Sequence, residues 1–159
     1  VKWVSSAKAF SKDCLEEKRK ICKNLVTQHA GLAAANALNP IPGTDIAIDL
    51  SVLINLLSKI RKNYGLDDAE IEAYIQMFPA IANMSNRVIK YAGKEGAFLL
   101  LKKYAGREML EKFAKYVPIV GQAIAAAIGF QVTKMAGDSY VETCHEVAEE
   151  ILDKELGIG

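Results

Sequence analysis

The chain has 159 residues, which suffice for one domain with a substantial core and are too few for two ordinary domains. Its 51% hydrophobic and 25% charged residues, with only 4 prolines, exclude disordered and collagen-like chains. The net charge of +1 lacks the basic excess of proteins whose main partner is nucleic acid. We therefore expect a single domain over residues 1–159 and no nucleic-acid partner.

The cysteines and the first residues bear on the cellular compartment. Cys14, Cys22 and Cys144 are odd in number and form no C-x-x-C pair, which argues against a disulfide framework or a thiolate zinc site. Cys22 and Cys144 lie on apolar helix faces and are expected to be core thiols. No signal peptide follows Val1, and the absence of an initiator methionine indicates a fragment of a longer polypeptide. The expected location is cytoplasmic, with peripheral membrane contact.

Helical periodicity runs through nearly the whole chain, and the alternation typical of strands is absent. A first helix is expected from Ser5 or Ser6, both good N-caps, to about Thr27. An Ala-rich piece from Ala30 to Leu38 is either a second helix or a continuation of the first past Gly31. Asn39-Pro40-Ile41-Pro42-Gly43 must then break the helix, because prolines remove donors and restrict the preceding residues.

The middle of the chain predicts three helices. The first, from about Asp45 to Lys62, is apolar nearly all round and is expected to be the central buried helix, with Gly65 available for a left-handed stop. Asp67 and Glu70 resemble a capping box that starts the next helix, which ends near Phe78. Pro79 suits the first turn of a helix that runs to about Tyr91.

Two longer helices complete the chain. The segment from Glu95 to Tyr116 is amphipathic and basic, and Val117-Pro118 ends it. The last helix is expected from about Val120 to Glu155, with Tyr140, Cys144, Val147 and Ile151 on its buried side. The predicted fold is therefore all-α: a compact bundle of about six to seven helices with a long C-terminal helix.

Two interhelix turns share the pattern P-I-x-G-x-x-I-A, at Pro40–Ala47 and Pro118–Ala125. The same type of turn used twice explains this repeated pattern, and a duplicated hairpin is the alternative. The residues expected to shape the turns are Pro40, Pro42, Gly43, Pro118 and Gly121. Small residues recur near both turns, which favours close packing between the two Ala-rich helices.

The sequence contains few patterns that carry chemistry. There is no phosphate-binding G-x-x-x-x-G-K-[ST] and no H-E-x-x-H, so we expect no catalysis, cofactor or metal in this chain. His145, Glu146 and Glu149 resemble a metal cluster on one helix, although a solvated acidic face explains them as well. Asp45 and Asp49 lie one turn apart and are either a cation or acid/base pair or structural groups at a helix N-terminus.

The basic segment from Glu95 to Tyr116 has the composition of an interfacial helix on anionic lipid, and an ordinary bundle helix is the alternative. A membrane-spanning hairpin is disfavoured, because the uncharged windows are short or interrupted by polar residues and proline. The candidate membrane-binding residues are Phe98, Leu101, Lys102, Lys103, Met109, Lys112, Phe113 and Lys115.

With these features in place, the chain resembles the C-terminal helical domain of the immunity-related, interferon-inducible GTPases. It is also similar to the helical domain of unknown function attached to bacterial GTPases. The resemblance covers nearly the whole chain and rests on turns and caps. The segments that carry it are Leu15-Glu16-Glu17-Lys18-Arg19-Lys20, Asn39-Pro40-Ile41-Pro42-Gly43-Thr44-Asp45-Ile46-Ala47-Ile48-Asp49, Tyr64-Gly65-Leu66-Asp67-Asp68 and Tyr116-Val117-Pro118-Ile119-Val120-Gly121.

The resemblance implies a GTPase domain upstream in the same polypeptide, beside which this domain would be non-catalytic. It also implies roles in regulation, self-association and peripheral membrane targeting, with the residues from Glu95 to Tyr116 matching the family's membrane-contacting helix. Gly96 and Gly106 depart from a strong helix there. The alternative is a membrane-inserting or pore-like helical protein, with hairpins at the two Pro-Ile-x-Gly turns.

Overall fold

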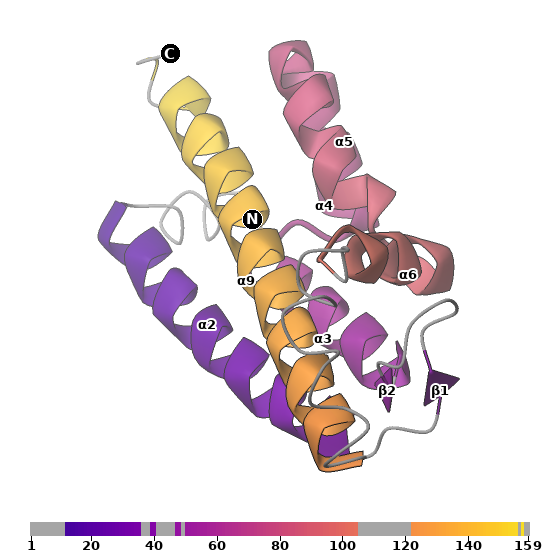
Figure 1. The fold of residues 1–159 in the computed structure, drawn as a ribbon. Helices are drawn as coiled ribbons and strands as arrows, with labels where there is room; N and C mark the ends of the chain where they lie inside the picture. Colours follow the sequence, from indigo (N-terminus) through magenta and orange to yellow (C-terminus); the bar gives the residue numbers. More distant parts are fainter. Residues whose placement is uncertain are drawn as a thin grey trace.

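Two long helices organise the chain in the computed structural model, which describes residues 12–35, 39–40, 47–48, 50–104, 122–155 and 157. Within these ranges the fold is an all-α bundle of six α-helices, with one 3₁₀ turn and one short β ladder (Figure 1). The elements are α2 (Lys12–Ala35), β1 (Asn39–Pro40), β2 (Ala47–Ile48), α3 (Leu50–Asn63), α4 (Asp68–Met77), η1 (Pro79–Ile81), α5 (Ala82–Lys90), α6 (Gly93–Tyr104) and α9 (Gln122–Glu155).

The C-terminal helix α9 is the central element of the bundle. Its 34 residues span about 50 Å at the rise of an α-helix. It packs along α2 and also contacts α3, α5, α6, η1 and β2 (Figure 1). The expected long C-terminal helix is therefore confirmed. The sequence predicted that α3 would be the central helix, but that position is taken by α9.

Helix α2 is continuous from Lys12 to Ala35, so the Ala-rich piece continues the first helix past Gly31. Glycine lowers helix stability by only about 1 kcal/mol, which the packing of α2 against α9 offsets. The expected packing between the two Ala-rich helices is confirmed here, since a Cβ built on Gly31 would lie 3.9 Å from Phe130 Cε2 of α9.

The core lies where α2, α3 and α9 meet. The four residues predicted on the buried side of the last helix, Tyr140, Cys144, Val147 and Ile151, are all buried. They belong to the same core cluster as buried side chains that recur with the helical period on the other two helices, namely Leu15, Cys22 and Val26 of α2 and Leu53, Leu56, Leu57 and Ile60 of α3. The burial of apolar side chains from these three helices is the main contribution to the stability of the bundle.

Several helix boundaries follow the local signals. Asp67 is the N-cap of α4, and its Oδ1 accepts a hydrogen bond of 3.1 Å from the Glu70 backbone nitrogen. Gly65 has φ of 65°, the left-handed conformation that stops α3. Pro79 opens the 3₁₀ turn η1 directly before α5. All three predicted helix start and stop signals are therefore confirmed.

The start of α3 differs from the expectation. The helix begins at Leu50 and not at about Asp45, because Ala47 and Ile48 are extended and pair antiparallel with Asn39 and Pro40. The residue before a proline favours extended backbone, so Asn39 is suited to such a ladder. The turn residues Pro42, Gly43, Pro118 and Gly121 lie outside the described residues.

Candidate functional site

Helix α6 contains the described part of the predicted membrane-binding segment. It begins at Gly93, two residues before the expected start, and is described to Tyr104. Lys102 and Lys103 are exposed, whereas Phe98 is partly buried and Leu101 is completely buried in the core. Leu101 is therefore not part of the exposed surface of the folded bundle, because its side of α6 packs on α3 and α9.

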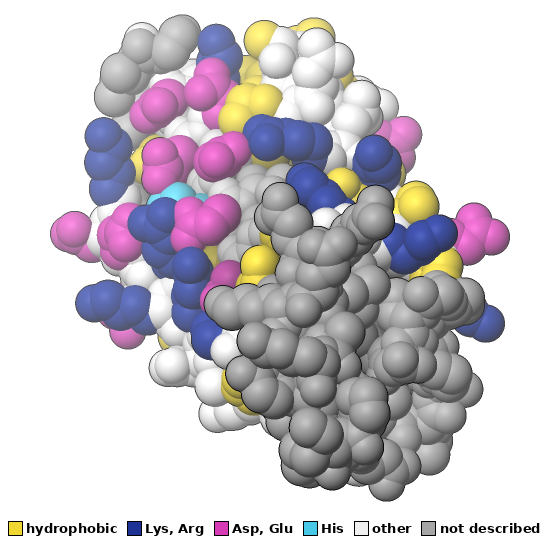
Figure 2. All heavy atoms as spheres, viewed as in Figure 1, with side chains coloured by type: hydrophobic (Ala, Val, Ile, Leu, Met, Phe, Trp, Pro, Cys, Tyr) yellow, Lys and Arg dark blue, Asp and Glu magenta, His cyan; other side chains and the backbone are white. Residues whose placement is uncertain are grey.

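The exposed side of α5 and α6 is basic. Between residues 82 and 104 there are five basic residues and one acidic residue, Glu95. Ile89 and Leu99 are exposed hydrophobic side chains, at 41% and 50%, in this segment. Figure 2 shows dark blue side chains among yellow ones over this part of the molecule. We call Arg87, Lys90, Lys94, Lys102 and Lys103, together with Ile89 and Leu99, the basic segment.

Two of these lysines lie over aromatic rings of their own helix. Lys102 Nζ is 5.4 Å from the ring centroid of Phe98, and Lys103 Nζ is 5.7 Å from that of Tyr104. Both lysines remain exposed. The ammonium groups are thus held close to the helix surface while still available to an anion.

The remaining predicted residues lie outside the described part of the chain. They are Met109, Lys112, Phe113 and Lys115 of the membrane segment and the polar pair Asp45 and Asp49. Their roles stay predictions.

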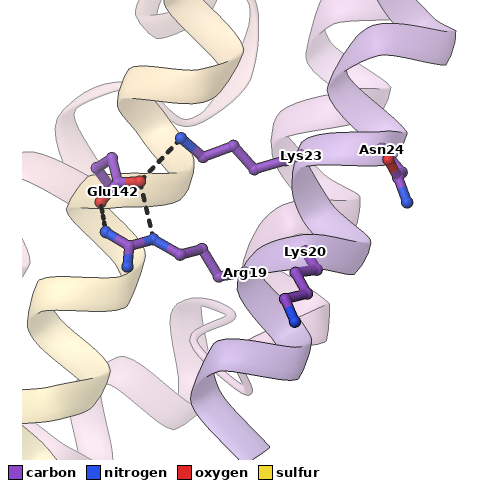
Figure 3. Close-up of a pocket in the computed structure, with 5 residues that line it drawn as sticks. All are labelled: Arg19, Lys20, Lys23, Asn24 and Glu142. Carbon is purple, nitrogen blue, oxygen red and sulfur yellow. Dashed lines mark hydrogen bonds and ion pairs between the residues drawn. The ribbon is translucent and has the colours of Figure 1, made fainter.

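A second polar region lies along the seam between α2 and α9. Glu142 of α9 accepts hydrogen bonds from Arg19, at 3.0 Å from Nε and also from Nη2, and forms an ion pair of 2.9 Å with Lys23 Nζ (Figure 3). An open hollow of about 660 Å³ is lined by Arg19, Lys23 and Glu142 together with Lys20 and Asn24. The hydrogen bonds from Arg19 lower the pKa of Glu142 from 4.5 to about 2.

His145 lies further along the same seam and is almost completely buried, at 2% exposure. Its Nδ1 is 3.0 Å from the Tyr64 hydroxyl, and the two rings meet edge to face with centroids 5.9 Å apart. Its Nε2 is 2.6 Å from Glu149 Oε1 and 3.5 Å from Glu16 Oε1. One imidazole nitrogen is therefore anchored inside the bundle while the other points toward two carboxylates at the surface.

The cluster differs from the one suggested by sequence spacing. Glu146 does not join it, since its Oε2 is 3.0 Å from Arg87 Nη2. Glu16 of α2 takes that place, and one ligand atom from each of Glu16, His145 and Glu149 lies within 4.8 Å of the others. Glu16 and Glu149 could have been paired from sequence only with knowledge of how α2 is rotated against α9.

Three buried groups around this seam stay neutral, namely the thiols of Cys22 and Cys144 and the hydroxyl of Tyr64. Burial raises the pKa of Cys22 to about 11 and raises the pKa of Cys144 and of Tyr64 well above their usual ranges. The core position expected for the two thiols is confirmed. Neither thiol is a reactive thiolate, and Tyr64 acts as a hydroxyl.

Among the described residues, no helix combines the length and the hydropathy that are needed to cross a lipid bilayer. Comparison of the chain with models of protein families, with curated proteins and with solved structures gives no match.

Proposed function

We propose that this chain is a non-catalytic helical domain of an immunity-related-type GTPase, in which it mediates regulation, self-association and peripheral membrane targeting. The observation that carries the membrane part is the basic segment. It combines exposed lysines with two exposed hydrophobic side chains and contains a single acidic residue, Glu95. The GTPase part rests on the resemblance of the turn and cap residues.

The physical basis of membrane binding is the attraction of basic side chains to anionic headgroups. Each Lys or Arg near such a surface contributes about 1 kcal/mol, and exposed Ile89 and Leu99 add apolar contact at the interface. The long-range part of this attraction is screened by salt, with a Debye length of about 8 Å at physiological ionic strength. Peripheral binding by this domain is therefore reversible and depends on anionic lipid.

Vesicle flotation tests the membrane part. The protein should float with vesicles that contain phosphatidylserine and not with phosphatidylcholine alone, and raised salt should release it. The triple variant Lys94→Glu, Lys102→Glu, Lys103→Glu should lower partitioning by about 100-fold or more, since three favourable contacts of about 1 kcal/mol each are lost.

The matched control reverses three exposed lysines on α2 and α3 instead, with Lys12→Glu, Lys59→Glu and Lys62→Glu. It changes the net charge equally but leaves the basic segment intact, so it should retain most of the binding. Equal losses in both variants would show a non-specific effect of net charge, and unchanged binding of the first variant would refute the assigned surface.

The GTPase part has a separate test. The coding sequence upstream of Val1 should contain a G-x-x-x-x-G-K-[ST] motif after a predicted strand. An upstream region that encodes no nucleotide-binding domain would refute it and would leave the membrane test unaffected.

A further inference from the structure

The buried His145 and its two carboxylate neighbours form an arrangement that neither the membrane nor the GTPase proposal uses. We propose that Glu16, His145 and Glu149 bind a divalent transition-metal ion of the Zn²⁺ class across the seam between α2 and α9. The ion would be held by His145 Nε2 and one oxygen from each carboxylate, with water completing the coordination.

The donor set fits this ion. Zn²⁺ accepts imidazole nitrogen and carboxylate oxygen at about 2.0–2.2 Å, which places neighbouring ligand atoms roughly 3.3 Å apart in a tetrahedral site. The 3.5 Å between His145 Nε2 and Glu16 Oε1 is close to that separation. The 2.6 Å between Nε2 and Glu149 Oε1 is shorter than that separation, so this contact must lengthen when the ion binds. Glu149 can make this move because its side chain is 55% exposed.

Tyr64 supplies the second interaction that metal-binding histidines usually have. A metal-bound histidine commonly donates its other N–H to an oxygen atom, which fixes the ring and the tautomer. The Tyr64 oxygen lies 3.0 Å from Nδ1 and is buried, so it can accept that hydrogen bond. With the proton on Nδ1, the lone pair of Nε2 faces the two carboxylates, and these three electron-rich groups require a proton or a cation between them.

The surroundings favour a cation only at this end of the seam. Glu142 is already neutralised by Arg19 and Lys23, whereas Glu149 Oε1 has its contact of 2.6 Å with the imidazole Nε2 of His145. Arg19 Nη1 lies 3.2 Å from Glu16 Oε1 and competes with the metal for that oxygen. Its stronger hydrogen bonds go to Glu142, so Glu16 can turn toward the metal without leaving Arg19 unpaired.

Such a site would connect the two longest helices through their side chains. Glu16 lies near the start of α2, and His145 and Glu149 lie one turn apart on α9. Binding would therefore stabilise the folded bundle in proportion to the logarithm of the free metal concentration.

Equilibrium dialysis with Zn²⁺ and thermal unfolding of the whole chain test the site. One Zn²⁺ should bind per chain and raise the melting temperature, and Mg²⁺, which prefers oxygen ligands, should do neither. Glu16→Gln and Glu149→Gln, both at exposed positions, should each lower Zn²⁺ affinity at least 10-fold. Tyr64→Phe removes the oxygen that positions the imidazole and should lower it by about 10–100-fold.

The matched controls are Glu17→Gln and Glu146→Gln, which remove the same charge from the neighbouring positions and should leave affinity unchanged. Co²⁺ provides a spectroscopic control, because a site without thiolate shows no sulfur-to-metal charge-transfer band, and Cys14→Ser should not change the result. No Zn²⁺ binding, equal loss in the controls, or loss with Cys14→Ser would each overturn the proposal.

Discussion

A close contact between the two long helices gives a sharp prediction at Gly137 of α9. A Cβ built on Gly137 would lie 2.7 and 2.9 Å from the two γ-methyl carbons of Val26 and 3.2 Å from Leu56 Cδ2. Val26 and Leu56 are completely buried. Because both methyl groups of Val26 are in the way, rotating its side chain does not remove the clash, and Gly137→Ala must push α2 and α9 apart.

The size of the effect follows from two opposing contributions. Overpacking a core of this kind costs about 1–3 kcal/mol. Replacing a helical glycine with alanine recovers about 1 kcal/mol of helix propensity. Two of the Cβ distances lie below 3.0 Å, so the upper part of the overpacking range, about 2–3 kcal/mol, applies. Gly137→Ala should therefore lower the free energy of unfolding by about 1–2 kcal/mol. For a chain of this size that corresponds to a fall in melting temperature of several degrees.

Gly31→Ala is the matched control, because it makes the same substitution inside the partner helix. Its Cβ would be 3.9 Å from Phe130 Cε2, an ordinary van der Waals contact. The variant should therefore be more stable than the parent by up to about 1 kcal/mol. Urea denaturation followed by circular dichroism measures both.

Val26→Ala should reveal the source of the clash. In the double variant with Gly137→Ala, the missing methyl groups make room for the new Cβ. The double variant should therefore lose about 1 kcal/mol less stability than the sum of the losses in the two single variants. A Gly137→Ala protein as stable as Gly31→Ala would refute the close approach of the helices at this point.

Two further predictions concern buried and half-buried polar groups. The Tyr140 hydroxyl donates to the Val88 carbonyl at 2.7 Å and accepts from Arg61 at 3.1 Å, so Tyr140→Phe should destabilise the fold by about 1–3 kcal/mol, measured by urea denaturation. Glu142 has its pKa lowered from 4.5 to about 2, chiefly by its hydrogen bonds with Arg19, so its ionised form contributes stability that is present above pH 4.5 and lost as the pH falls toward 2. The carboxylate is 35% exposed, which limits the contribution to about 1 kcal/mol; Glu142→Gln should lose this amount at pH 7, and denaturation curves of parent and variant should converge at low pH.

The sequence by itself determined most of the helical architecture of the described residues. Asp67, Gly65 and Pro79 act through contacts within a few residues, such as a side chain that accepts from the first turn or a backbone in the left-handed region. Apolar spacing likewise identified the buried side of α9. These features can be predicted without the rest of the fold, because they depend on residues that are close together in the sequence, within one or a few turns of the same helix.

Contacts between residues far apart in the sequence explain the predictions that were wrong. The helix expected from Asp45 begins at Leu50, since Ala47 and Ile48 pair with residues before the turn. Propensity over a short window cannot reveal such a partner. Long-range packing also explains why Leu101, predicted as a membrane-binding residue, is buried. Its side of α6 packs on α3 and α9, which the sequence of α6 alone cannot show.

The tertiary structure alone decided which groups meet between helices. Periodicity shows which residues share one face of a helix, but the rotation and the axial register of α2 against α9 depend on how side chains of both helices interdigitate. That packing brings Glu16 to His145 across the seam, directs Glu146 to Arg87, and makes Gly137 intolerant of a methyl group where Gly31 accepts one.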